Sequence, residues 1–171
     1  MILASALAVR KSKEVSPFLR GNAKVYDGSF DRDTFSSITG VSESVEFTIL
    51  ATLNIAQLPP QTQTILTFGQ VVSASSKFIV LNIRNDNKIG FQFNAGGTPG
   101  NQKGINIRSI QNAQIGKQTI AATYDASKAA SGIKLYVNGI GISTEVLRDN
   151  IGGESVLPLE NNSCGIGGNA G

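Results

Sequence analysis

Hydrophobic and polar residues alternate along much of the chain with a period of two. Between Val45 and Leu53 every second residue is apolar, and Leu50 is the one large apolar residue among the positions between them. This spacing puts the apolar side chains on one face of an extended segment, as in a half-buried antiparallel strand. Comparable segments follow at short spacing, and we expect further strands at Thr64–Phe68, Phe78–Arg84, Lys88–Phe93, Gly104–Ile110, Gln118–Tyr124, Gly132–Val137 and Ile140–Leu147.

Turn-forming residues separate these segments, at positions 85–87, at positions 96–100 and at Asn138-Gly139. An Asn-Gly pair between apolar segments predicts a two-residue hairpin, because both central residues of that turn adopt a positive φ. Ala126–Ser131 is the one helix-like stretch, and we expect it to be a loop because it is so short. Eight or more short strands without a long helix predict an all-β protein, an antiparallel two-sheet jelly-roll sandwich.

Charge and composition distinguish the N-terminal segment from the rest of the chain. The first 24 residues contain five basic residues against one acidic residue, whereas the other 147 residues carry 10 basic and 11 acidic groups. Pro17 and Gly21 interrupt any helix in this segment. We therefore expect residues 1–22 to form an extended N-terminal arm, which is either solvated or docked on an acidic partner, and residues 23–171 to form one sandwich domain.

The apolar run at the N-terminus predicts neither secretion nor membrane insertion. In this run, MILASALAV, the basic residues follow the apolar stretch, whereas a signal peptide carries them before it. No stretch of the chain reaches the roughly 20 apolar residues that a membrane-spanning helix needs. We therefore expect no signal peptide and no membrane anchor.

Five segments carry a resemblance to a known family. They are IAATYD at 120–125, GIKLYVNG at 132–139, VEFTI at 45–49, TILTFG at 64–69 and GIGG at 165–168. In this order they resemble the concanavalin A-like lectin/glucanase superfamily, and more closely its laminin-G-like and pentraxin-like branch. The resemblance implies a lectin-like sandwich over roughly residues 23–168, and it says little about a ligand.

Two departures from the family pattern affect what the resemblance implies. The family often has a Trp just before the strand that ends in Thr-Tyr-Asp, and this chain has Gln118 near that position. The family also continues beyond its Gly-Ile-Gly segment into a closing strand, whereas this sequence ends at Gly171. Either the sequence is a fragment of the family's domain, or something else fills the edge where the closing strand would lie. The segment Ile2–Val9 could supply that strand to its own subunit or to a neighbour.

The residue types argue against catalysis. The sequence has no His and one Cys, so it cannot form the common Ser–His or Cys–His pairs. Glu43 and Glu46 are the nearest approach to a glycosidase carboxylate pair, but a spacing of three places them on opposite faces of a strand. Cys164 has no activating base nearby in the sequence, and we interpret it as a small buried apolar residue. The sequence predicts a protein that is not an enzyme.

Calcium is the cofactor that the acidic turns of this chain could hold. Lectin-like sandwiches bind Ca²⁺ through Asp, Asn and carbonyl oxygens. Asp27, Asp31 and Asp33 form one candidate metal site. The turn at positions 85–87 forms another, although both clusters also have the composition of ordinary turns.

Candidate ligand-binding residues follow from what a sugar site requires, which is an apolar platform beside polar side chains. The sequence has no Trp and three Tyr. The platform candidates are Tyr26 and Tyr136, together with Phe30 and Phe35, and each of these could equally serve in packing. The polar candidates are Asn85, Asp86 and Asn87.

The two favoured functions are both non-catalytic. The first is a structural or attachment protein of a multi-protein particle such as a phage or virus virion, located at the particle surface and contacting other subunits through residues 1–22. The alternative is a glycan-binding module of an extracellular protein. A divergent glycosidase is disfavoured by the missing carboxylate pair. Nucleic acid is disfavoured as a partner, because the body of the chain lacks a basic stripe with interleaved aromatic residues.

Overall fold

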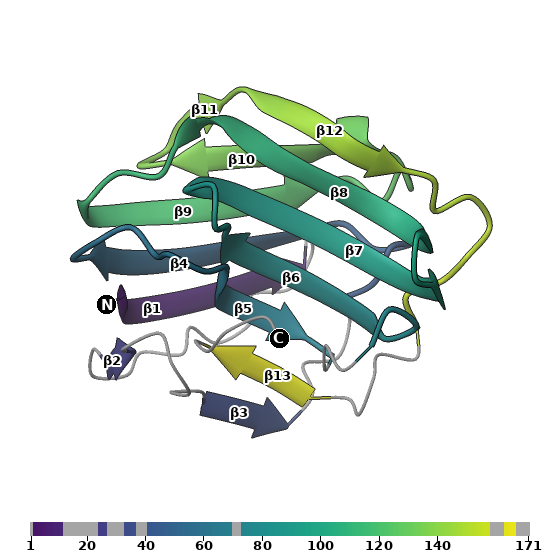
Figure 1. Cartoon of the computed structure of the whole chain (residues 1–171), viewed down its shortest axis with the longest axis horizontal. Coiled ribbons are helices and arrows are strands. Elements are labelled where there is room, and N and C mark those ends of the chain that lie inside the picture. Colours follow the sequence, from purple (N-terminus) through teal and green to yellow (C-terminus); the bar gives the residue numbers. More distant parts are fainter. Residues whose placement is uncertain are drawn as a thin grey trace.

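The computed structural model describes residues 2–11, 24–26, 33–36, 41–69, 73–157 and 163–166. Within these residues, thirteen strands and one short 3₁₀ helix form two stacked sheets (Figure 1). The strands are β1 (Ile2–Lys11), β2 (Lys24–Tyr26), β3 (Asp33–Ser36), β4 (Phe47–Ile55), β5 (Gln63–Phe68), β6 (Lys77–Ile83), β7 (Lys88–Thr98), β8 (Asn101–Asn112), β9 (Gly116–Tyr124), β10 (Ile133–Val137), β11 (Ile140–Ile142), β12 (Thr144–Asp149) and β13 (Ser163–Ile166).

The first sheet, sheet A, has the strand order β11-β10-β9-β4-β1-β2. The second, sheet B, has the order β12-β8-β7-β6-β5-β13-β3 and lies in front of sheet A in Figure 1. Neighbouring strands run antiparallel in both sheets. The chain passes from β4 in sheet A to β5–β8 in sheet B, and then back to β9–β11. This confirms the predicted all-β jelly-roll sandwich.

The core fills the space between the two sheets, because each strand turns alternate side chains inward. In β4 the burial alternates along almost the whole strand, with Phe47, Ile49, Ala51, Leu53 and Ile55 all buried. Four aromatic rings meet at the centre, with centroid distances from 4.7 to 6.3 Å. These rings belong to Phe47, Phe91, Phe93 and Tyr124.

Strand β1 of the N-terminal segment lies inside sheet A of its own chain. It pairs with β4 from Ile2 opposite Ile55 to Lys11 opposite Phe47, and its other edge pairs with β2. Residues 2–11 thus cover an edge of β4 that would otherwise be open. The sequence left open whether this segment would pair within its own subunit or with a neighbour. The division of the chain at residue 22 stays a prediction.

The predicted single strand Ile140–Leu147 is wrong. Residues 140–142 form β11 in sheet A, and residues 144–149 form β12 in sheet B. The chain changes sheets at Ser143, whose carbonyl oxygen accepts a hydrogen bond from the Ile110 amide at 2.9 Å. Alternation of residue types continues through the crossing, and neither Gly nor Pro marks it in the sequence.

The predicted hairpin at Asn138-Gly139 is confirmed. Asn138 has a φ of 52° and Gly139 a φ of 81°, and the flanking residues Val137 and Ile140 pair directly. The Asn138 side-chain oxygen accepts a hydrogen bond from the Thr119 amide at 2.8 Å, which ties the turn to β9.

Residues 126–131, predicted to be a loop, contain only the start of the 3₁₀ turn Ala130–Gly132. In the part of the chain that the structure describes, no helix is long and apolar enough to cross a membrane.

Candidate functional site

The outer face of sheet B, which points away from sheet A, carries polar side chains across four strands. Phe91 and Phe93 of β7 point into the core, so Gly90, Gln92 and Asn94 occupy the outer positions of this strand. Strand pairing then brings the other outer residues alongside these three. We call this surface the polar face; it consists of Asn82, Arg84, Gly90, Gln92, Asn94, Gln102, Asn106, Arg108, Glu145 and Arg148.

The side chain of Asn82 in β6 and that of Arg84, the residue just after β6, converge above Gly90. A Cβ atom on Gly90 would lie 2.3 Å from Asn82 Oδ1 and 3.0 Å from Arg84 Cδ, so these side chains fill the space that any larger residue would need. Asn82 is only 6 % exposed, and its Oδ1 has no hydrogen-bond partner. Arg84 Nε is also buried without one, because the nearest carboxylate oxygen, Asp86 Oδ2, is 3.8 Å away. We call this arrangement the Gly90 cluster.

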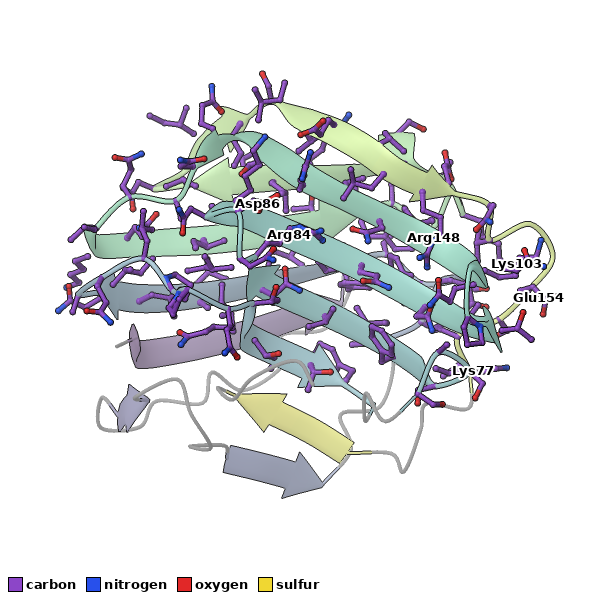
Figure 2. The ribbon with its side chains drawn as sticks, viewed as in Figure 1. Lys77, Arg84, Asp86, Lys103, Arg148 and Glu154 are labelled. Atoms are coloured by element: carbon purple, nitrogen blue, oxygen red, sulfur yellow. The ribbon has the colours of Figure 1, made fainter. Side chains whose placement is uncertain are left out.

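A second cluster surrounds Arg148 of β12. It lies at the level of Asn94, four residues after Gly90 on β7. Arg148 Nη1 donates to Asn94 Oδ1 at 3.3 Å, and Nη2 donates to Gln102 Oε1 at 3.1 Å. The Asn94 amide group in turn donates to the Ser76 carbonyl oxygen at 2.6 Å. Among the described residues, no carboxylate lies within ion-pairing distance of Arg148. We call this arrangement the Arg148 cluster, and Figure 2 shows Arg148 well separated from Arg84 and Asp86 on sheet B.

Asn106 of β8 lies between the two clusters. It is opposite Gln92 on one side and Arg148 on the other. Its Nδ2 donates to Gln92 Oε1 at 3.5 Å, but its Oδ1 is buried and has no partner. The polar face therefore holds two amide oxygens, on Asn82 and Asn106, that are ready to accept a hydrogen bond.

A network of charged groups lies at one side of the polar face and includes two of its members, Arg108 and Glu145. Arg108 bonds to Asp86 at 2.5 Å and to Glu145 at 2.7 Å, and Lys88 bonds to the same Glu145 oxygen at 3.1 Å. The hydrogen bond with Glu145 raises the pKa of Arg108, and the bond with Arg108 lowers the pKa of Glu145. Both carboxylates are therefore engaged by cations.

The predicted ligand turn at positions 85–87 lies beside the polar face. Asp86 contacts Arg108 as described, and its Oδ1 accepts from the Lys88 amide at 3.2 Å. Asn87 has a φ of 64°, as expected for a turn residue. Asn85 is exposed, and its backbone amide donates to Thr62. Among the three predicted ligand residues at positions 85–87, Asp86 contacts side chains of the polar face, those of Arg84 and Arg108.

Tyr136 lies apart from this turn. It is a half-buried residue of β10 in sheet A and faces Gly141 of β11. Tyr26 belongs to β2 and Phe35 to β3, and the structure describes only the backbone at both positions. Phe30 lies outside the described residues. A sugar platform at these positions stays a prediction.

The proposed calcium site falls almost entirely outside the described residues. Asp27 and Asp31 lie there, and Asp33 is the first residue of β3, where only the backbone is described. Within the described ranges, no three Asp, Glu, Cys or His side chains gather in a way that could hold a metal ion. The prediction at Asp27, Asp31 and Asp33 is untested.

Glu43 has a structural role. It lies in the turn before β4 and not on a strand as expected, and it is 3 % exposed. Its Oε2 accepts from the Val156 amide at 3.2 Å, and its carbonyl oxygen accepts from the Tyr124 hydroxyl at 2.7 Å. Glu46 is exposed, and Cys164 lies in β13, where only the backbone is described.

Sequence reasoning missed the amide residues of the polar face. Alternating polar residues on β6–β8 look like an ordinary solvated face. The available signal was the type of residue, because Asn82, Gln92, Asn94 and Asn106 are amides at positions where a solvated strand usually carries charged or hydroxyl side chains.

No protein-family model matches the chain, and no curated protein matches it. Three solved structures of the CBM40 module of the Ruminococcus gnavus IT-sialidase are similar in fold. The form bound to α2,3 sialyllactose has a TM-score of 0.49 and 17 % identity, covering 81 % of this chain and 80 % of that one. The form bound to α2,6 sialyllactose has a TM-score of 0.47 and 18 % identity, with the same coverage.

The third of these structures, solved without a named ligand, has a TM-score of 0.49 and 15 % identity, covering 78 % of each chain. These values describe a similar arrangement of strands, and they do not identify a ligand for this chain.

Proposed function

We propose that this chain is a non-catalytic glycan-binding sandwich that holds sugar hydroxyl groups on the polar face. The observation that carries the proposal is the Gly90 cluster. There an amide oxygen and a guanidinium N–H, on Asn82 and Arg84, are both buried and both unpartnered. A hydroxyl group donates one hydrogen bond and accepts others, so a single sugar hydroxyl can satisfy both atoms.

The cost of leaving these two buried atoms without hydrogen-bond partners supports the proposal. A buried polar group without a partner costs about 1–3 kcal/mol, and this cost is removed when a ligand supplies the missing bond. Arg84 and Asn82 lie against the same point above Gly90. Because the Arg84 side chain is 25 % exposed and its ionic contact with Asp86 is long, it can move aside to admit a hydroxyl.

The rest of the polar face suits the same kind of ligand. Gln92, Gln102 and Asn106 present amide groups, which match the mixed donor and acceptor character of sugar hydroxyls. Asp86 and Glu145 both bind Arg108, so they supply neither the nucleophile nor the general acid of a glycosidase. These contacts favour binding over cleavage.

The proposal extends to kinship and location. Residues 120–125 and 132–139, which carry the resemblance to the laminin-G-like and pentraxin-like branch, form the neighbouring strands β9 and β10 with their connecting loop. Glycans are displayed outside cells, so we propose that the chain works in an extracellular setting or on the surface of an assembled particle. A role as a virion subunit rests on the sequence arguments alone.

A glycan array tests the proposed function. We expect the protein to bind at least one glycan, and we expect Asn82→Ala to weaken that binding at least tenfold because the amide acceptor is lost. Asn54→Ala is a matched control, since Asn54 is an exposed amide on β4 of the other sheet. It should bind like the unmodified protein. Binding to no glycan, or equal binding by Asn82→Ala, would show that the proposal is wrong.

A further inference from the structure

We infer that the polar face binds a linear oligosaccharide of at least two sugar residues, laid along β7. This inference rests on the proposed function and specifies the class of ligand. It follows from three features of the described residues: the distance between the two polar clusters, the unpartnered amide between them, and the burial of the one aromatic side chain on this face.

The length of the site comes from the strand. Gly90, Gln92 and Asn94 are successive outer residues of β7, with the Gly90 cluster at one end and the Arg148 cluster at the other. Four residues of an antiparallel strand span about 13 Å. A single pyranose ring is shorter than this, so a ligand that contacts both clusters must contain at least two linked sugars.

The middle of the site is also equipped for binding. Asn106 Oδ1 is buried without a partner beside Gln92, halfway between the clusters. An oligosaccharide that binds the Gly90 cluster with one sugar and extends toward Arg148 passes over this amide. A hydroxyl group of its second sugar can then donate a hydrogen bond to Asn106 Oδ1. The unpartnered acceptors at Asn82 and Asn106 thus lie along one path.

Because no aromatic ring is accessible on the described part of this face, the affinity for a glycan should depend on the length of the glycan. Phe78 is the aromatic residue at the outer positions of β6, β7, β8 and β12 among the described residues, and it is only 6 % exposed. Stacking on an aromatic ring is therefore not available to a sugar on this surface. Hydrogen bonds that replace those to water are individually weak, so affinity has to accumulate over several sugars.

Calorimetric titration with a series of shortened glycans tests this inference. The probe is the glycan with the strongest array signal, shortened one sugar at a time from each end to the monosaccharide. We expect at least a tenfold loss of affinity between the disaccharide and the monosaccharide. Equal affinity of the monosaccharide and the full glycan would overturn the inference and leave the proposed function intact. Absence of binding by every glycan would overturn the proposed function itself.

Two variants locate the ends of the ligand. Asn82→Ala removes the acceptor at one cluster, and Arg148→Ala removes the guanidinium donors at the other. We expect both variants to weaken binding of the full glycan, whereas a shortened glycan should respond to one of them and not to the other. If every shortened glycan responded equally to both variants, the sugars would not be distributed along β7. Thermal unfolding of each variant, compared with Asn54→Ala, verifies that the fold is retained.

Discussion

Single residues in this protein show two contrasting ways of burying a polar group. Tyr124 and Glu43 are buried with partners, and together they join three segments that are distant in the sequence. Tyr124 donates to the Glu43 carbonyl oxygen and accepts from the Lys128 amide at 2.8 Å. Asn82 and Asn106 are different, because each keeps an unpartnered oxygen on the outer face of sheet B. The first kind of burial stabilises the fold, and the second supports the proposed ligand site.

The Tyr124 hydroxyl should make the protein sensitive to alkali. Burial raises its pKa to about 12, compared with about 10 in the unfolded chain. The folded state therefore holds this proton more tightly, so its contribution is complete below pH 10 and is lost as the pH rises through 12. We expect Tyr124→Phe to reduce the fall in stability between pH 10 and 12.

At neutral pH, Tyr124→Phe should also lower the free energy of unfolding by about 1–2 kcal/mol, because two hydrogen bonds are lost. Denaturant unfolding at several pH values measures both effects. An identical alkaline decline in the variant and the unmodified protein would contradict this account.

Glu43 should make the protein sensitive to acid. Burial raises the pKa of its carboxyl, but hydrogen bonds from Ser155 and the backbone, with Lys128 nearby, outweigh burial and lower it overall. Its contribution is therefore present above the unfolded pKa of about 4.3 and is lost as the pH falls through the lower folded value.

We expect Glu43→Gln to lower stability at pH 7 and to flatten the acid limb of a plot of unfolding free energy against pH. Glu46→Gln, at an exposed position, is the control and should leave the plot unchanged. An acid limb in Glu43→Gln as steep as that of the control would argue against this role.

Among the elements, the first part of β8 depends on a glycine. Gly104 has a φ of +151°, and a Cβ atom there would lie 2.1 Å from the Phe93 carbonyl oxygen of the neighbouring strand. The pairing register also shifts nearby, between Asn94 and Gly97. This irregularity lies beside Asn94 and Gln102, so it helps to position the Arg148 cluster.

We expect Gly104→Ala to destabilise the protein by at least about 2 kcal/mol, because the added methyl group meets backbone atoms that cannot move independently. Gly153→Ala is the control, since a Cβ atom at Gly153 meets nothing within 4 Å. Thermal unfolding of the two variants provides the comparison, and similar midpoints would refute the expectation.

The strands themselves could largely be predicted from the sequence. Period-two burial located the bounds of β4 to β10 to within three residues, because the core imposes the same alternation that the sequence displays. The exception is the end of β7, which runs five residues past the predicted Phe93 into the predicted turn at 96–100. The crossing at Ser143 could not be predicted, since alternation reports which residues are buried and not which sheet buries them. The Gly90 cluster could not be predicted either, because it requires that Asn82 and Arg84 converge across the strand pairing above Gly90.

In the whole molecule, β1 links the N-terminal segment to the stability of the sandwich. It occupies the edge of β4 over nine paired positions. An uncovered strand edge exposes backbone groups that pair readily with other chains. The stability of the fold and its resistance to self-association should therefore both depend on this strand.

Deletion of residues 1–11 tests the contribution of β1. We expect a lower unfolding midpoint and a larger apparent mass in size-exclusion chromatography, because the edge of β4 becomes available to neighbouring chains. An unchanged midpoint together with an unchanged elution volume would show that β1 contributes nothing to sheet A.

The central claim is that glycans bind on the polar face, and an NMR titration of the labelled protein tests it most directly. The side-chain amide signals of asparagine and glutamine report on each candidate contact separately. On addition of the glycan that binds best on the array, we expect the signals of Asn82, Gln92 and Asn106 to shift while that of Asn54 stays fixed. Shifts confined to sheet A around Tyr136, with these three signals unmoved, would contradict the account.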